Sequence, residues 1–185
     1  MTFLENYWYG AALSDDVGAE PFARLICNQP IVFYRDASGA VAALEDCCCH
    51  RQAPLSLGDV EGDIIRCGYH GWAFDREGAC VEVPGQDVIP SSAHIQQYPV
   101  AEHAGWIWVW IGDSNKADIA SLPDLPWFDD TDYRHWHLYL HGNAAAQLFV
   151  DNMMDISHTG YLHKQTIGTR EMTAKMRVRT EDTRV

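Results

Sequence analysis

The chain has 185 residues, 47% of them hydrophobic, and a formal net charge of -13 at pH 7. This length suits one ordinary domain, or one small domain and part of another. The negative charge repels phosphate backbones and argues against nucleic acid as a partner. No run of about eighteen apolar residues appears and the first residues lack a basic segment, so neither a membrane span nor a secretory signal is expected.

The first 112 residues are predicted to form an antiparallel, all-β domain. Runs of β-branched and aromatic residues alternate with short polar turns, such as Asp36-Ala37-Ser38-Gly39. We expect strands at residues 6–12, 24–27, 31–35, 41–45, 64–66, 72–74, 79–83 and 105–112. The tryptophans of the last strand are interpreted as packing residues rather than as a ligand platform.

Two short motifs between these strands offer metal ligands. Cys48-Cys49-His50 follows one predicted strand, and Cys67-Gly68-Tyr69-His70 follows another. Zinc fingers usually place both cysteines in one knuckle and both histidines in the other. Here each loop offers one cysteine and one histidine, which suits a Rieske 2Fe-2S cluster, where the cysteines hold one iron and the histidines the other. The ligand order favours the cluster, and a structural zinc ion is the alternative.

The remaining cysteines are interpreted as bystanders. Cys47 and Cys49 flank the first ligand, but only Cys48 lies two residues before His50. Cys27 and Cys80 are expected to be small buried hydrophobic residues. Cysteines concentrated around a metal site suggest a reducing cytoplasm rather than a disulfide scaffold.

The amino-acid composition changes after residue 112. Residues 113–130 contain prolines and several acids and are predicted to be a linker. Residues 133–141 alternate as a strand, with His135, His137 and His141 forming a polar face. Residues 131–185 are interpreted as the incomplete beginning of a second, α+β domain.

A helix capped by Asn143 and running from residue 144 to 158 is expected next. Steps of three would place Asn152, Asp155 and His158 on one side of it. A break at Gly160 would then bring His163 towards His158. The two imidazoles would bind one Fe(II) ion, and a carboxylate would be needed to complete its three-ligand set.

The runs CCHRQAPLSLGD, CGYHGWAFDREG and DNMMDISHTGYLH resemble the signatures of Rieske non-haem iron oxygenases. Cys49 departs from the pattern, in which a proline is common. The three-residue step from Asn152 to Asp155 is similar to that of the vanillate O-demethylase and dicamba monooxygenase branch. The resemblance covers the cluster domain and only the opening of the catalytic domain.

The resemblance implies a terminal oxygenase component with a 2Fe-2S cluster and a mononuclear Fe(II). It implies His158 and His163 as iron ligands, and Asp155 as a bridge that bonds His158 and, across a subunit boundary, His70. Asn152 would shape the outer shell of the iron. The implied partners are a reductase or ferredoxin, a small aromatic substrate with O2, and two further copies in a homotrimer.

The third iron ligand of the family, a downstream acid, is expected beyond Val185. Glu171, Glu181 and Asp182 are the last acids, around a predicted returning strand at 172–179. Whether the chain is a short product or a fragment is left open, and so are its substrate and the choice between demethylation and hydroxylation. The alternative functions are a stand-alone Rieske electron carrier and an inactive fragment.

Overall fold

The computed structural model describes residues 3–128, 130–137, 139–166 and 168. The chain divides into two compact units, residues 1–135 and 136–185. Within the described residues, no helix has the length and apolar character needed to cross a membrane. The acids and the strand predicted beyond residue 170 lie outside the described residues.

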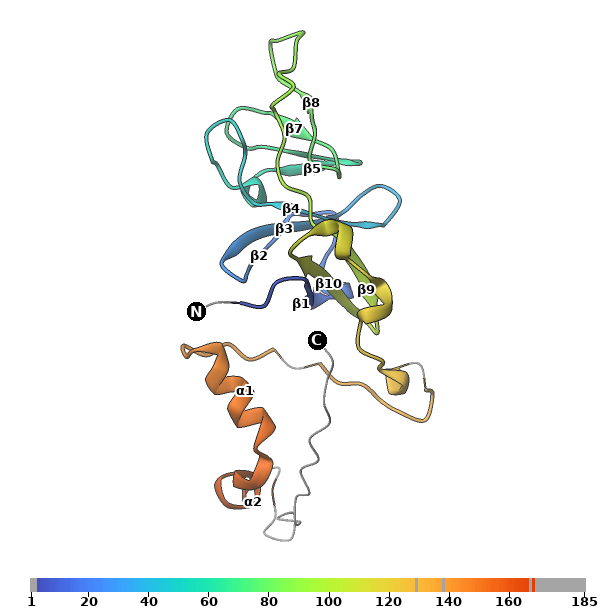
Figure 1. Ribbon diagram of the computed structural model, residues 1–185, viewed down its shortest axis with the longest axis vertical. Helices are drawn as coiled ribbons and strands as arrows, with labels where there is room; N and C mark the ends of the chain where they lie inside the picture. Colours follow the sequence, from blue (N-terminus) through green and yellow to red (C-terminus); the bar gives the residue numbers. More distant parts are fainter. Residues whose placement is uncertain (1–2, 129, 138, 167, 169–185) are drawn as a thin grey trace. The chain divides into compact units, whose positions relative to one another are not determined.

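Three antiparallel sheets form the first unit, in the orders β1-β10-β9, β2-β3-β4 and β5-β6-β7-β8 (Figure 1). The strands are β1 (Tyr7–Leu13), β2 (Phe22–Ile26), β3 (Gln29–Arg35), β4 (Val41–Glu45), β5 (Asp59–Glu61), β6 (Ile64–Arg66), β7 (Ala73–Phe74), β8 (Cys80–Glu82), β9 (Val100–His103) and β10 (Trp106–Ile111). The predicted all-β fold is confirmed. β5 and β9, which the sequence patterns did not indicate, complete the sheets.

The middle sheet is buried on both faces because its central strand contributes to two cores. Successive side chains of a strand point to opposite faces. Accordingly, Ile31 and Phe33 of β3 join the core shared with β10, while Val32 and Tyr34 join the core beneath the β5–β8 sheet. All four side chains are fully buried. One ligand motif follows β4 of this sheet, and the other follows β6 of the sheet that packs on it.

The strand β10 separates its aliphatic and aromatic residues in the same way. Ile107 and Val109 lie in the core. Trp110 packs edge-on against Trp8 with ring centroids 5.4 Å apart, and the Trp108 indole N–H donates to the His103 carbonyl. The tryptophans therefore serve packing, as predicted.

The stretch 113–130, interpreted as a linker, belongs to the first unit and is bonded to its β domain. It contains the 3-10 helices η3 (Ser114–Lys116), η4 (Ile119–Ser121) and η5 (Pro126–Phe128). The Trp8 indole donates to the Asp118 carbonyl, and the His103 ring bonds the Pro123 carbonyl. Two earlier 3-10 helices, η1 (Ser14–Asp16) and η2 (Leu55–Leu57), shape turns in the β domain.

The second unit differs from the expectation in two places. The predicted strand at 133–141 is wrong, because its described residues have no strand geometry. The helix α1 spans Ala146–Met154, with Ala145 rather than Asn143 at its N-cap. It ends before Asp155 and is followed by η6 (Ile156–His158) and α2 (Thr159–Leu162). In this part of the chain, polar–apolar alternation and residue propensity predict secondary structure poorly, because most of the described side chains are exposed and little packing selects a strand or a helix.

Candidate metal centres

The first ligand loop follows β4 and closes on its own backbone. The Cys48 N–H donates to the Ala53 carbonyl at 2.9 Å, and the Gln52 N–H donates to the Cys48 carbonyl at 2.8 Å. Gln52 has a φ of 57°, in the left-handed region that non-glycine residues seldom adopt. Ahead of the loop, the Asp46 carboxylate accepts bonds from the Ser56 N–H and hydroxyl at 2.7 and 2.6 Å. The loop is therefore fixed at both ends.

The second ligand loop, between β6 and β7, repeats this backbone pattern. The Cys67 N–H donates to the Trp72 carbonyl at 2.8 Å, and the Gly71 N–H donates to the Cys67 carbonyl at 2.9 Å. Gly71 takes the left-handed position, with a φ of 76°. The two loops are thus matching turns, each with its cysteine at the base.

The matching turns sort the four predicted ligands into two pairs. The thiols of Cys48 and Cys67 interact with each other, and each residue is only 2% exposed. The rings of His50 and His70 lie outside them, with centroids 4.7 Å apart. Two sulfurs inside and two imidazoles outside is the division of ligands that a Rieske cluster requires.

Two atomic details show that these residues fit such a cluster. His50 Nδ1 is buried and has no hydrogen-bond partner among the described residues, which leaves a ring nitrogen for a metal. The His50 ring stacks on Trp72, with centroids 4.7 Å apart and planes 6° from parallel. The sequence analysis did not assign Trp72 this role, although its place two residues after His70 is a usable signal.

In the metal-free state, burial favours the neutral form of both kinds of ligand. Burial raises the pKa of the Cys48 thiol to about 11, so without metal it keeps its proton at neutral pH. Burial and the nearby His70 lower the pKa of His50, which favours the neutral imidazole that metals bind. Metal binding would displace the thiol protons.

Two glycines allow the ligand loops to approach each other. A Cβ atom on Gly58 would lie 1.9 Å from the Arg66 carbonyl oxygen, and one on Gly68 would lie 2.7 Å from the Leu57 carbonyl oxygen. Any larger residue at Gly58 would push the backbone before Cys67 away from the exit of the first loop.

The other cysteines are free thiols. Cys47 is half-buried, Cys49 is exposed, and Cys80 lies in the core beneath the loops. Cys27 is partly buried against the other core and has a φ of 51°.

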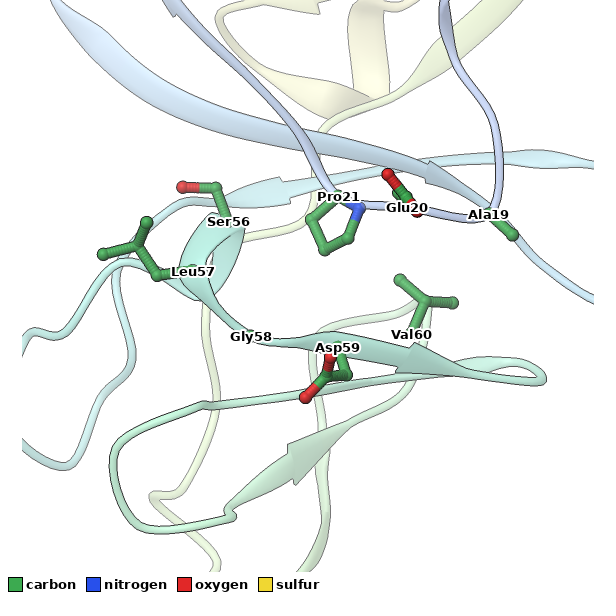
Figure 2. A pocket seen from close by; sticks show the side chains of 8 residues that line it. All are labelled: Ala19, Glu20, Pro21, Ser56, Leu57, Gly58, Asp59 and Val60. Atoms are coloured by element: carbon green, nitrogen blue, oxygen red, sulfur yellow. The ribbon is translucent and has the colours of Figure 1, made fainter.

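A surface pocket of about 430 Å³ lies beside the exit of the first loop (Figure 2). Pro21, before β2, and Val60, in β5, form part of its lining together with Ser56, the residue that bonds Asp46. The pocket therefore adjoins a residue that supports the loop, and contains none of the four ligands.

The second centre lies in the second unit and has two histidines side by side. The rings of His158 and His163 have centroids 5.4 Å apart and are nearly edge-on. The chain breaks its helix at Asp155, before His158, and not at Gly160, which is buried inside α2. Consequently Asn152, exposed on α1, does not share a continuous helix with His158.

Asp155 meets His158 through its backbone. His158 Nδ1 lies 2.7 Å from the Asp155 carbonyl oxygen, and because a carbonyl only accepts, this nitrogen carries the proton. The Asp155 carboxylate instead accepts the Ser157 N–H at 3.0 Å, and bonds to Ser157 lower its pKa. The expected carboxylate bond to His158 is therefore replaced by a carbonyl bond, which leaves Nε2, in the neutral ring, as the nitrogen without a proton.

Comparison with known proteins adds an independent line of support. Residues 7–99 match the Rieske [2Fe-2S] domain, and residues 142–185 match the vanillate O-demethylase oxygenase C-terminal domain.

The chain is 44% identical over 168 residues to the iron-sulfur subunit of the toluene-4-sulfonate monooxygenase system of Comamonas testosteroni, covering 90% of this chain and 48% of the relative. It is 42% identical over 170 residues to the vanillate O-demethylase oxygenase subunit of Pseudomonas sp. (strain HR199 / DSM 7063), covering 92% and 48%. A crystal structure of dicamba monooxygenase bound to dicamba superposes with a TM-score of 0.84 at 40% identity, covering 89% of this chain and 49% of that one.

The chain spans about half the length of these relatives. Its ligand loops, its match to the Rieske domain and its relatives agree with one another. The chain therefore belongs to the Rieske non-haem iron oxygenases, in the branch that includes the vanillate O-demethylase and dicamba monooxygenase oxygenase subunits.

Proposed function

We propose that this chain carries the cluster domain and the first iron ligands of the terminal oxygenase component of an aromatic monooxygenase or O-demethylase. The observation that carries the proposal is the inner pair of thiols, Cys48 and Cys67, beneath the outer pair of imidazoles, His50 and His70. A reductase or ferredoxin would supply electrons. We expect the protein in the reducing cytoplasm, where its free thiols persist.

When bound, the cluster supplies one-electron transfer, and the mononuclear iron supplies the site where O2 is reduced and one oxygen atom enters a small aromatic substrate. The chain's own residues hold and orient these groups. Cys48 and Cys67 provide the buried ligands, while the exposed His70 presents the edge of the site to a partner. His158 and His163 provide two of the iron ligands, with the His158 tautomer fixed by the Asp155 carbonyl.

We further propose a homotrimer in which the Asp155 carboxylate meets His70 of a second copy. A carboxylate has about four lone-pair sites, and the bonds from Ser157 use two of them, which leaves room for an imidazole N–H. Asn152 would then shape the surroundings of the iron. The domain limits proposed for this arrangement are 1–112 for the cluster domain, 113–130 for the connection and 131–185 for part of the catalytic domain.

A stand-alone electron carrier is the competing function. It would have no use for the adjacent rings of His158 and His163, so this pair favours the oxygenase.

The first experiment is anaerobic reconstitution of the chain with ferrous iron and sulfide. We expect two irons and two sulfides at the first centre, visible absorption and the electron paramagnetic resonance (EPR) signal of a reduced Rieske cluster. Colourless protein that binds zinc stoichiometrically would refute the proposal.

The bridge is tested in the complete oxygenase subunit with its reductase. Asp155→Ala should retain both metals but lose the coupling of electron consumption to product. Asp151→Ala, within the helix α1 that ends just before Asp155 and bonded to Gln147, is the matched control and should remain coupled. Coupled turnover by Asp155→Ala would rule out the bridge.

A further inference from the structure

Arg66 is the last residue of β6 and directly precedes the ligand Cys67. Its side chain is 22% exposed and is held by carboxylates of two other strands. Nε and Nη2 donate to the two oxygens of Glu61 at 2.9 and 3.0 Å, and Nη2 also donates to Glu82 at 2.9 Å. Two carboxylates on one guanidinium fix its plane and its position.

The remaining nitrogen of this guanidinium reaches the ligand loop itself. Nη1 donates to the Gly71 carbonyl at 2.8 Å. Gly71 follows His70 directly, and its own N–H closes the loop on the Cys67 carbonyl. One side chain therefore connects the start of the loop, beside the thiol ligand, with its end, beside the imidazole ligand.

The sheet register makes this arrangement possible. Arg66 pairs with Ala73 on β7, and Ala73 pairs with Glu82 on β8. Paired residues share a face of the sheet, so a small residue separates the guanidinium from Glu82. A side chain larger than Ala73 would obstruct the reach of Arg66 across β7.

We propose that Arg66 is a positioning residue for the cluster, which orients the second ligand loop and holds a positive charge, paired with the carboxylates of Glu61 and Glu82, close to the irons. This inference rests on the proposed function, because it assumes that Cys67 and His70 bind the cluster. The reduced cluster carries one more negative charge than the oxidised cluster, so a nearby cation stabilises the reduced state.

The test uses the reconstituted chain and two readouts, the midpoint potential and the EPR g-values of the reduced cluster. Arg66→Gln removes the cation and leaves two carboxylates unpaired. At a fixed ambient potential, the ratio of reduced to oxidised cluster should fall by about tenfold, which corresponds to 59 mV for a one-electron couple. Arg66→Lys keeps the charge but lacks the planar fork, so the potential should largely recover while the g-values stay shifted.

Arg35→Gln is the matched control. The Arg35 guanidinium is also held by a carboxylate, Glu102, and by main-chain carbonyls, those of Ser14, Val17 and Gly39, and none of these partners belongs to a ligand loop. This variant should unfold at a lower temperature and keep the wild-type potential and g-values.

If Arg66→Gln does not fold, the variants Arg66→Lys and Glu82→Gln provide the test of the inference. Glu82→Gln removes a negative charge and should raise the ratio of reduced to oxidised cluster several-fold. Wild-type potential and g-values in these variants would overturn the inference, even with reduced thermal stability. Wild-type protein that forms no cluster would instead refute the proposed function, so the two failures are distinguishable.

Discussion

The two candidate metal centres differ in how the chain supports them. At the first, two matching turns follow β4 and β6, and the thiols of Cys48 and Cys67 are almost fully buried. At the second, His158 and His163 lie on short helical turns after α1, whose apolar side chains, including Leu148 and Met153, are exposed. The comparison shows that one short stretch of chain encloses the candidate cluster ligands, whereas the two histidines proposed as iron ligands follow a helix whose apolar side chains are exposed.

The ligand assignment gives the largest expected effect. Cys48→Ser or Cys67→Ser should abolish the cluster, measured as loss of visible absorption and of the Rieske EPR signal, because hard oxygen ligands replace soft thiolates. The double variant Cys47→Ser/Cys49→Ser should keep both signals. Loss of the cluster in the double variant alone would mean that the ligand in the triplet is not Cys48.

The independence of the centres is the next test. In the complete oxygenase subunit, His158→Ala or His163→Ala should lose the mononuclear iron and turnover, since each removes one of the two proposed imidazole ligands. The EPR signal of the cluster should be unchanged. His141→Ala is the control for loss of an exposed histidine in the same unit and should retain full iron content. Full iron content in both ligand variants would contradict the assignment.

The close approach of the loops predicts an intermediate effect. Gly58→Ala should lower the free energy of unfolding by about 1–3 kcal/mol, because its Cβ collides with a backbone oxygen rather than a flexible side chain. Chemical denaturation measures this loss. Gly18→Ala, whose Cβ would meet nothing within 4 Å, should change the free energy by no more than about 0.5 kcal/mol. Equal effects would mean that the approach at Gly58 is not restrictive.

The smallest effect concerns pH and the first unit alone. Bonds from Ser38, the Ala40 N–H and Arg76 lower the pKa of Asp36 from its ordinary 3.8. A lowered pKa adds stability above pH 3.8, which is lost as the pH falls through the pKa of the folded state. Asp36→Asn should therefore unfold at a lower temperature than wild type at pH 7, and the difference should shrink as the pH falls below 3.8. Asp87→Asn, in an exposed loop, should show no such pH-dependent difference.

The sequence by itself determined the strands that deliver the ligands and the identity of the cluster. Alternation and turn composition are local properties, so the hairpin ending at β4 and the spacing of Cys48, His50, Cys67 and His70 were readable without coordinates. The family resemblance, also carried by short motifs, was confirmed by the comparisons.

Only the tertiary structure decided which groups support the ligands. The stacking of Trp72 on His50, the contact at Gly58 and the reach of Arg66 across β7 join residues on different strands or loops, and local patterns do not specify such contacts. The sequence pattern also did not predict the helix break at Asp155. There the Asp155 carboxylate accepts a bond from the Ser157 N–H, and this local bond competes with the hydrogen bonds of a continuous helix. The 3.6-residue periodicity of the sequence gives no sign of this competition.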